Sequence, residues 1–564
     1  MPAGHPGPVT RRSFLGTAAK TGVAAGALVS APGLLTAPAR AATPRAGMNI
    51  LLVMVDQLRT PWVYMPPKLQ RSAMPTVTKL GKQGVRFSNY FTSSNDCTPS
   101  RTTQATGLYT HQTAIFATTP PTDLTSGFPT WGTMLRQNGY DTYWFGKWHL
   151  SGGQNGSCDT DPYEAYGFTA DWPGSGTCPS PNGGPGQGLA MDPVIRQQFV
   201  DWIGARATGG KPWAATVSFV NPHDIAWYPR STRKVEGQSN PPSVYRRLPA
   251  NFESAEARRT RHKPDMQRRA QQIENELFGP MPAERENPRL WTKMLDTYLL
   301  MHNQADIQVG LVLDALEASP FADNTIVVFV SDHGEYGGAH GMRGKGFAFY
   351  DEGARVPLIV KDPTGGWTKQ TRLDRSQLVE SVDLAALMLT LGTGGDDWRG
   401  DSTYAQIAGR ADIAGILQSP TAKGRAYIAH ATDEPGTSAA IPTAQQRNPA
   451  PNHVTAVRTR HGKFARYAYW KDGTTTIDES RPIHYEAYNY DDKAGRLELD
   501  NVYGKRGAGA GDKALVRRLD RLLDRAMTHN IEAPLPAALQ ATQAQAYRDW
   551  FAQPPATFIR ATDN

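Results

Sequence analysis

The sequence predicts an α/β fold, with a large, mostly parallel sheet sandwiched by helices and a smaller C-terminal α+β domain that contains an antiparallel sheet. Three observations support this prediction: continuous apolar runs of strand length, helical segments between them, and a change of pattern after Lys361. Strands that are buried on both faces read as continuous apolar runs, and helices that alternate with strands connect parallel strands.

Four apolar runs of strand length each end abruptly in polar residues. They cover 49–55 (NILLVMV), 140–145 (YDTYWF), 213–220 (WAATVSFV) and 325–330 (TIVVFV). In a parallel sheet the carboxyl ends of the strands lie at one edge, where ligands bind. We therefore expect the polar residues that follow these runs to converge.

The segment 291–317 is the clearest helix, because its apolar residues recur at steps of three and four. Farther along, a Gly- and Asp-rich stretch at 392–401 precedes two strand-like segments, 425–431 and 456–470. These segments indicate the antiparallel sheet of the smaller domain.

These patterns divide the chain into a leader (1–41), a main domain (48–420) and a smaller C-terminal domain (421–564). A basic insertion interrupts the main domain at about 229–288, and within 230–269 eleven Lys or Arg residues face four acidic residues. We expect a solvated, partly helical insertion. The alternative is a rim that attracts an anionic substrate or polymer.

The leader has the layout of an export signal. Arg11 and Arg12 precede an uncharged, Ala- and Gly-rich run at 21–39, which is typical of twin-arginine export. The run contains two prolines, which disfavours the alternative of a permanent membrane anchor. The expected location is periplasmic or extracellular, with the twin-arginine export machinery as a partner and no stable membrane insertion.

Composition excludes some classes of protein. The formal net charge is +8, and removal of the four cationic residues of the leader leaves +4, which does not suggest nucleic-acid binding. Three cysteines in 564 residues cannot be the main source of stability, so a large hydrophobic core must be. Cys158 and Cys178 flank a turn-rich loop and are expected to form a disulfide. The alternative for Cys97 is a structural thiol or a bond to Cys158.

Polar pairs follow two of the apolar runs: Asp56 with Gln57, and Asp332 with His333. Their oxygen and imidazole donors suit one divalent cation at the sheet edge, with calcium first and magnesium or manganese as alternatives. Each pair alone would more commonly cap a helix or end a strand. Their repetition after two separate runs favours the metal site.

Four further residues, Lys147, His149, His223 and Lys345, are cations or hydrogen-bond donors. A tetrahedral anion needs such groups around its oxygens. Singly, a lysine is usually solvated and a histidine is usually a satisfied core or surface residue. They predict an anion-binding site if they meet at the same sheet edge.

The run CTPSR at 97–101 resembles the Cys-x-Pro-x-Arg signature of type I sulfatases, a family of the alkaline phosphatase superfamily. Other segments resemble the family and follow its order: NILLVMVDQ, GKWHL, NPHD, the run from Ser331 to Val360 and the tail YEAYNYDDKAGRLELDNV. Ordered agreement is more specific than one short motif. The resemblance implies an alkaline phosphatase-like fold with a catalytic domain at 48–420.

The resemblance also implies roles for the candidate residues. In the family, a formylglycine-generating enzyme oxidises the cysteine, and this fate falls on Cys97, which would then contact the metal. One hydroxyl of the hydrated aldehyde attacks sulfur, the other later expels sulfate, and Arg101 stabilises the diol. The other roles are binding of sulfate oxygens by Lys147, His149 and Lys345 and protonation of the leaving oxygen by His223.

The chain departs from the family at Gln57, where many members have an acid, and at His333, where many have asparagine. The expected function is an exported sulfatase acting on a small-molecule or carbohydrate sulfate ester. One alternative is a phosphate or phosphonate ester hydrolase of the same superfamily, which these two residues favour and the pair Lys147 and His149 disfavours. The other is a non-catalytic binder of anionic glycans that uses the basic segment 230–269 and the metal site without turnover.

Overall fold

The structure, a computed structural model, describes residues 46–118, 123–151, 163–170, 183–231, 236–237, 240–282, 288–367, 373–434, 451, 453–471 and 473–552. These residues belong to one compact unit that extends from Ala41 to Asn564. The predicted leader and the predicted Cys158–Cys178 disulfide lie outside the described residues. Among the described helices, none combines the length and the hydropathy that a membrane span requires.

The described residues form a main sheet of seven strands. In spatial order these are β4 (Asp141–Gly146), β5 (Trp213–Phe219), β1 (Asn49–Val55), β6 (Thr325–Ser331), β7 (Leu358–Lys361), β2 (Val85–Phe87) and β8 (Asp374–Arg375). Within this sheet, β7 runs antiparallel to both of its neighbours, and the other described pairings are parallel. The prediction of a mostly parallel sheet is confirmed, and the four predicted runs are β1, β4, β5 and β6.

The central strand β1 is apolar along its length because both of its faces are covered. Ile50 and Leu52 pack into one hydrophobic core, whereas Leu51 and Val53 pack into another on the opposite face. Each of these four side chains is fully buried.

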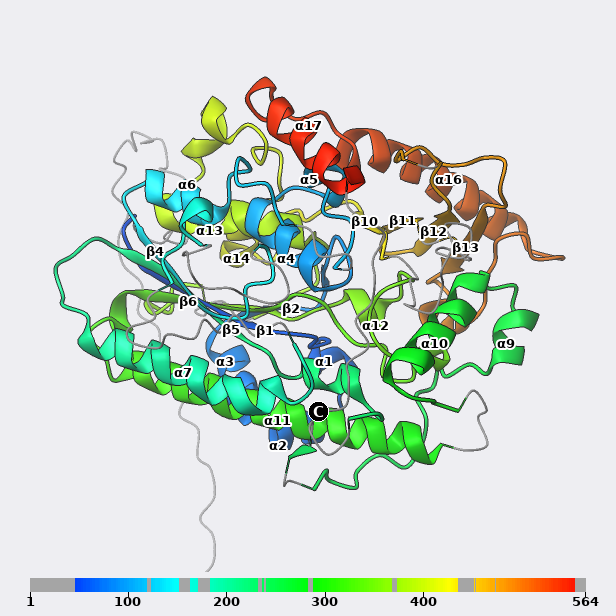
Figure 1. The fold of residues 1–564 in the computed structure, drawn as a ribbon, viewed down its shortest axis with the longest axis horizontal. Coiled ribbons are helices and arrows are strands. Elements are labelled where there is room, and N and C mark those ends of the chain that lie inside the picture. Colours follow the sequence, from blue (N-terminus) through cyan, green and yellow to red (C-terminus); the bar gives the residue numbers. More distant parts are fainter. Residues whose placement is uncertain are drawn as a thin grey trace, which may run out of the picture. The chain divides into compact units, whose positions relative to one another are not determined.

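Helices cover both faces of the main sheet (Figure 1). One layer contains α4 (Cys97–Thr106), α6 (Trp131–Gln137) and α13 (Leu384–Thr393), and the other contains α3 (Pro75–Gln83), α7 (Gln187–Ala205) and α11 (Arg289–Glu317). The predicted helix at 291–317 is α11. Side chains from these helices and from both faces of the strands fill the two cores, and the polar residues lie beyond the strand ends.

A second, antiparallel sheet follows in the C-terminal part of the chain. Its order is β10 (Ile428–Thr432), β11 (His453–Arg458), β12 (Gly462–Ala468) and β13 (His484–Asn489), and α16 (Ala510–Ala526) packs on it. This confirms the predicted antiparallel sheet. The predicted domain boundary at 420/421 stays a prediction.

The basic insertion contains α9 (Ala255–Thr260) and α10 (Asp265–Phe278). Some of its cations point inward: Lys263 is buried, and its Nζ lies 2.5 Å from Glu253 Oε2 and 2.6 Å from the carbonyl oxygen of Glu498. Others, such as Arg268, lie on exposed helix faces. The insertion is therefore partly helical as predicted, but part of its positive charge is neutralised internally.

Candidate active site at the strand ends

The strand register brings Asp56 and Asp332 side by side. In the parallel pair β1 and β6, Val55 lies opposite Ser331. The residue that follows each strand, Asp56 or Asp332, therefore lies next to the other beyond the strand ends. Arg101 of α4 bridges them: its Nη2 donates to Asp56 Oδ2 at 3.0 Å and its Nε donates to Asp332 Oδ2 at 2.8 Å. All three side chains are buried, and the guanidinium offsets the repulsion between the two carboxylates.

The surrounding charges move the pKa values of the two carboxyl groups apart. Burial and the nearby sulfur of Cys97 would raise the pKa of Asp56, but Lys147 and Arg101 hold it well below its usual range. Burial and the charge of Asp56 raise the pKa of Asp332. Asp56 is therefore the more strongly ionised member of the pair.

The predicted metal ligands form a compact set. One potential ligand atom each from Asp56, Cys97, Asp332 and His333 lies within 4.8 Å of the others. His333 Nδ1 lies 3.2 Å from the carbonyl oxygen of Gly334, an arrangement that leaves Nε2 to face the carboxylates. Two buried carboxylates and one imidazole fit a divalent cation. We call this set and the cations around it the Cys97 cluster.

Gln57, the remaining predicted ligand, turns the chain directly after β1. Its φ is +64°, in the left-handed region, and its backbone N–H donates to Asp332 Oδ1 at 3.1 Å. Its Nε2 donates to Glu335 Oε2 at 2.6 Å, and its Oε1 accepts from Lys345 Nζ at 2.8 Å. These two bonds orient the amide so that its oxygen lies beside the cluster.

Cys97 begins α4, and its sulfur lies among cations. Sγ lies 3.2 Å from His333 Nε2, 3.4 Å from Lys345 Nζ, 3.6 Å from Lys147 Nζ and 3.9 Å from Asp56 Oδ1. Burial alone would raise the pKa of the thiol, but Lys147, Lys345 and His333 lower it well below its usual value. The position therefore favours a negatively charged atom, as the N-terminus of a helix also does.

Lys147 and His149 follow β4 and face the same sulfur. Lys147 Nζ lies 2.7 Å from Asp56 Oδ2, and the carbonyl oxygen of Lys147 accepts from Arg101 Nη1 at 2.7 Å. His149 has a φ of +63°, which turns its imidazole to hydrogen-bonding range of Cys97. Burial lowers the pKa of His149.

His223 follows β5 at the start of the 3₁₀ helix η2 (His223–Trp227). Burial, Lys147 and Lys345 lower the pKa of its imidazole to about 3, so it is neutral before an anion arrives. Gly183 lies against it: a Cβ there would come within 2.6 Å of His223 Cε1 and 3.0 Å of Lys147 Nζ. The other nine predicted site residues thus lie around Cys97.

A cavity of about 150 Å³ opens beside the Cys97 cluster. Its polar lining includes His223, Lys345 and the carboxyl groups Asp96, Glu274 and Glu434. The other residues of the lining are Gln57, Ala226, Trp227, Ile273, Leu277, Phe278, Gly344 and Phe347. The insertion therefore contributes one apolar face of α10 and a glutamate to the cavity, and none of its Lys or Arg residues is among the described lining.

The three carboxyl groups of this cavity are not among the predicted site residues. Asp96 precedes Cys97 and Glu434 follows β10 by two residues, and the two side chains are hydrogen-bonded to each other. Burial raises the pKa of both groups, so each carboxyl group takes up a proton more readily than it would in water. A polar residue after a strand end is the signal that identified Asp56, and Glu434 carries the same signal. Glu274 lies within a helix and carries none.

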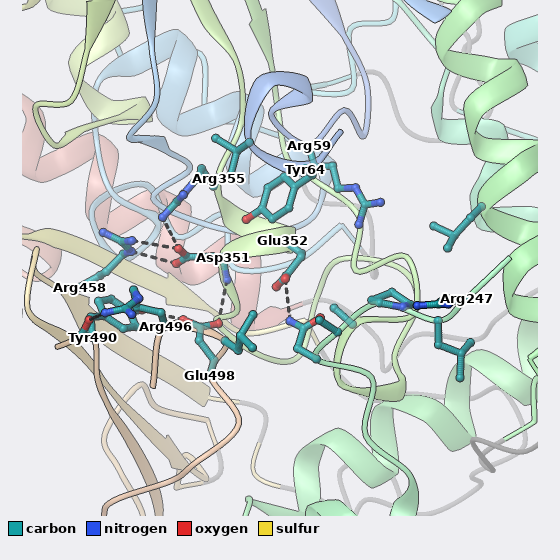
Figure 2. A pocket seen from close by; sticks show the side chains of 18 of the residues that line it. Arg59, Tyr64, Arg247, Asp351, Glu352, Arg355, Arg458, Tyr490, Arg496 and Glu498 are labelled. Carbon is teal, nitrogen blue, oxygen red and sulfur yellow. Dashed lines mark hydrogen bonds and ion pairs between the residues drawn. The ribbon is translucent and has the colours of Figure 1, made fainter. Parts of the chain in front are cut away.

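A second cleft, of about 600 Å³, has a lining rich in arginine (Figure 2). Its arginines are Arg59, Arg247, Arg355, Arg458, Arg460 and Arg496. Asp351 neutralises two of them, since it pairs with Arg355 and accepts from Arg458 Nε at 2.9 Å. None of the ten predicted site residues lines this cleft. The cleft and the cavity beside the Cys97 cluster are therefore distinct.

Comparison with known proteins agrees with this geometry. The model of the family described as Sulfatase matches residues 48–394. An uncharacterised sulfatase named YidJ from Escherichia coli (strain K12) is 27% identical over 364 residues, which cover 61% of this chain and 67% of that protein. Iduronate 2-sulfatase of Mus musculus is 28% identical over 345 residues, which cover 56% of this chain and 59% of that protein. The match thus spans about three fifths to two thirds of these relatives.

A solved structure with the same fold is a phosphonate monoester hydrolase from Silicibacter pomeroyi. Its TM-score is 0.60 at 18% identity, over 87% of this chain and 96% of the other. This similarity concerns the fold alone. With the family model matched across more than half of the chain, the protein belongs to the sulfatase family of the alkaline phosphatase superfamily.

Proposed function

We propose that the protein is an exported sulfatase that hydrolyses a sulfate ester with a hydrated formylglycine derived from Cys97 and one divalent cation. The observation that carries this proposal is the position of Cys97 between two buried carboxylates and the ammonium groups of Lys147 and Lys345. Membership of the sulfatase family supports sulfate ester hydrolysis.

Asp56, Gln57, Asp332 and His333 would hold the cation, next to residue 97. A divalent cation there supplies positive charge that favours an ionised oxygen nucleophile and offsets charge on the transferred group. Calcium is the first choice for the carboxylate and amide oxygens, and magnesium or manganese follows because of the imidazole. Arg101 keeps both carboxylates in place through its two hydrogen bonds.

Residue 97, as a hydrated aldehyde, would carry two hydroxyl groups. One attacks sulfur, so that a new S–O bond forms while the bond from sulfur to the ester oxygen breaks. The second hydroxyl then gives its proton to His223, which has lost one to the departing ester oxygen, the carbonyl re-forms and the bond from carbon to the sulfate oxygen breaks. Sulfate leaves and the aldehyde returns. Serine or unmodified cysteine lacks the second hydroxyl and would stop after the first step.

The side chains around Cys97 would bind the sulfate group and complete proton transfer. Lys147 and Lys345 lie within 3.6 Å of Sγ and would bind sulfate oxygens together with His149. His223 would protonate the departing oxygen. A sulfate ester brings negative charge next to this imidazole, which raises its pKa from the low value that burial and the two lysines impose.

The cavity lining favours a ring-shaped alcohol, such as a sugar or an aryl group, as the part of the substrate beyond the sulfate. Trp227 and Phe278 offer aromatic surface, and the carboxyl groups of Asp96 and Glu434 offer hydrogen bonds to hydroxyl groups. One relative is named for a sugar ester, iduronate 2-sulfatase, which supports a sulfated carbohydrate as substrate.

Export would follow the twin-arginine route, and residue 97 would then be oxidised in the cytoplasm by a formylglycine-generating enzyme before export. Fractionation of cells that produce the full chain tests this, with an Arg11→Lys/Arg12→Lys variant as control. The wild-type chain should leave the cytoplasm and the variant should remain there. Equal distribution of the two chains would contradict this route.

The decisive experiment combines mass spectrometry and kinetics on the protein produced together with a formylglycine-generating enzyme. The peptide that contains residue 97 should carry the aldehyde, and matched aryl sulfate, phosphate and phosphonate esters should be compared. Highest kcat/KM on the sulfate supports the proposal. A preference for the phosphonate would favour the hydrolase alternative, to which Gln57 and His333 point. No turnover by aldehyde-bearing protein would favour the glycan binder.

A further inference from the structure

A second cluster of metal-ligand side chains lies outside the Cys97 cluster. It consists of His111 from α5 (Thr110–Thr113), Asp433 directly after β10, and His453, the first residue of β11. We call it the His111 cluster. One potential ligand atom of each residue lies within 4.8 Å of the others. The antiparallel register places Thr432 opposite Val454, so Asp433 and His453 are the next facing positions.

All three side chains are buried, with exposed fractions of 2% for His111, 3% for Asp433 and 2% for His453. His453 Nδ1 lies 2.5 Å from Asp433 Oδ1. The two imidazole rings are close to each other, with a centroid distance of 5.4 Å. Burial of three polar groups from three separate chain segments is costly unless each has a partner.

His111 supplies the second observation that points to a ligand. Its Nδ1 lies 3.3 Å from the hydroxyl of Thr110, whereas its buried Nε2 has no hydrogen-bond partner among the described residues. A histidine that binds a metal usually makes an outer hydrogen bond through one ring nitrogen and presents the other to the ion. His111 has this arrangement, with Nε2 left for the ion.

The cluster also has a supporting shell and access to solvent. The aromatic rings of Phe116 and Trp470 pack against His111 at centroid distances of 5.1 and 6.0 Å. Tyr547 of α17 (Ala537–Ala552) donates its hydroxyl hydrogen to the carbonyl oxygen of His111 at 2.8 Å. A cavity of about 820 Å³ borders both histidines and has Glu532 in its wall. An ion could enter from it and keep a water ligand.

We propose that His111, Asp433 and His453 form a second metal site, for zinc or a similar divalent transition metal. Two imidazoles and one carboxylate are the ligand types that these ions prefer, whereas calcium and magnesium prefer oxygen alone. The bound ion fastens α5 to the ends of β10 and β11. It thereby steadies the segment that also carries Glu434 of the catalytic cavity.

The test uses the full chain, stripped with a chelator and then dialysed against zinc or cobalt. Metal bound per chain is measured by elemental analysis, and cobalt gives visible bands that report nitrogen and oxygen ligands. We compare the wild-type chain with His111→Gln and with His461→Gln. His461 is a matched control, because it faces Asp491 at 3.2 Å but its side chain is 65% exposed.

The wild-type chain and His461→Gln should bind one zinc more per chain than His111→Gln. In an Asp332→Asn background, which impairs the Cys97 cluster, zinc should still bind and raise the Tm. Addition of His111→Gln should weaken that binding by more than the roughly 10- to 100-fold that loss of an outer partner costs. Equal zinc uptake with and without His111→Gln would overturn the proposal and leave a His453–Asp433 pair only.

A glutamine can leave the chain folded while it removes the ligand nitrogen, and circular dichroism of each variant checks this. If the double variant fails to fold, comparison of wild type with His111→Gln alone decides the question. The proposal does not depend on the proposed function, since metal uptake is measured without substrate.

Discussion

The Cys97 cluster and the His111 cluster both bring buried carboxylates and imidazoles together, but their neighbours differ. In the first, Lys147 and Lys345 lie within 3.6 Å of the central sulfur, so positive charge surrounds a position for an anion. In the second, the aromatic rings of Phe116 and Trp470 pack against His111, and the cation Arg466 lines the adjoining cavity together with Glu532. In the two proposals, the same ligand types would therefore serve an anionic substrate beside a cation at the Cys97 cluster and a cation alone at the His111 cluster.

The largest expected effect is loss of the reacting group. Cys97→Ala should lower kcat/KM on a sulfate ester by about 10⁴-fold or more, because the nucleophile is gone. Cys97→Ser should stop as a covalent sulfo-enzyme, which intact-mass spectrometry would detect as one added SO₃ group. Zinc uptake at the His111 cluster should be unchanged in both. Steady turnover by Cys97→Ser would contradict the two-hydroxyl mechanism.

The next effect separates the two clusters by their ligands. Asp332→Asn removes a carboxylate of the proposed catalytic ion and should lower kcat by at least about 100-fold. His111→Gln should lower kcat by no more than about 3-fold, since no proposed catalytic side chain contacts it. Steady-state kinetics at saturating calcium measures both. The comparison between the clusters fails if the two losses are similar.

The third effect concerns proton transfer beside Cys97. His223→Ala should lower kcat/KM by about 10²- to 10⁴-fold for esters of poorly acidic alcohols, and much less for esters of acidic phenols. The dependence of rate on leaving-group pKa should therefore become steeper. Equal losses across a series of leaving groups would remove His223 as the acid.

The smallest expected effect is on the pH dependence of stability, and it concerns Glu274, which lies near Arg343 and Lys345. Burial raises the pKa of Glu274 to about 7, although Arg343 and Lys345 lower it. The folded protein therefore binds more protons than the unfolded chain between the usual glutamate pKa and about 7, so this residue makes stability fall as pH rises through that window. Glu274→Gln should remove on the order of 1–3 kcal/mol of that fall.

Denaturant unfolding of Glu274→Gln below about pH 5 and above about pH 7 measures this change. Glu256→Gln is the control, because Glu256 is exposed on the neighbouring helix α9. If the free energy of unfolding of Glu274→Gln depends on pH as in the wild type, the positive charges of Arg343 and Lys345 offset the effect of burial on this carboxyl group.

Elements with strong periodicity could be predicted from the sequence. The run at 49–55 coincides with β1, and the segment at 291–317 lies within α11, because burial on both faces or on one face leaves a clear pattern. β13 (His484–Asn489) has no comparable pattern, since its sequence HYEAYN contains one aliphatic residue and no apolar run. Its place is set by pairing with β12, which the local sequence does not encode.

Only part of the candidate site could be predicted from the sequence in the same way. Residues that follow apolar strands closely, such as Asp56 and His223, could be found because parallel strands end at one edge. The residues of α10 in the cavity wall could not be found from the sequence, because α10 reaches the cavity through a long connection. Ile273 and Phe278 have the spacing of ordinary buried helix residues. The His111 cluster joins α5 to β11 across more than 300 positions of sequence, so no motif spacing could reveal it.

The wall that α10 builds has a consequence for how this scaffold can change. The groups that would hold sulfate come from the segments after β4 and β6, whereas Ile273, Leu277 and Phe278 come from one amphipathic helix within an insertion. Exchanging the inward residues of that helix would retune which alcohol is accepted and leave the chemical step intact. In this proposal, changes in α10 would alter the range of substrates, while the residues around Cys97, elsewhere in the chain, would keep the reaction the same.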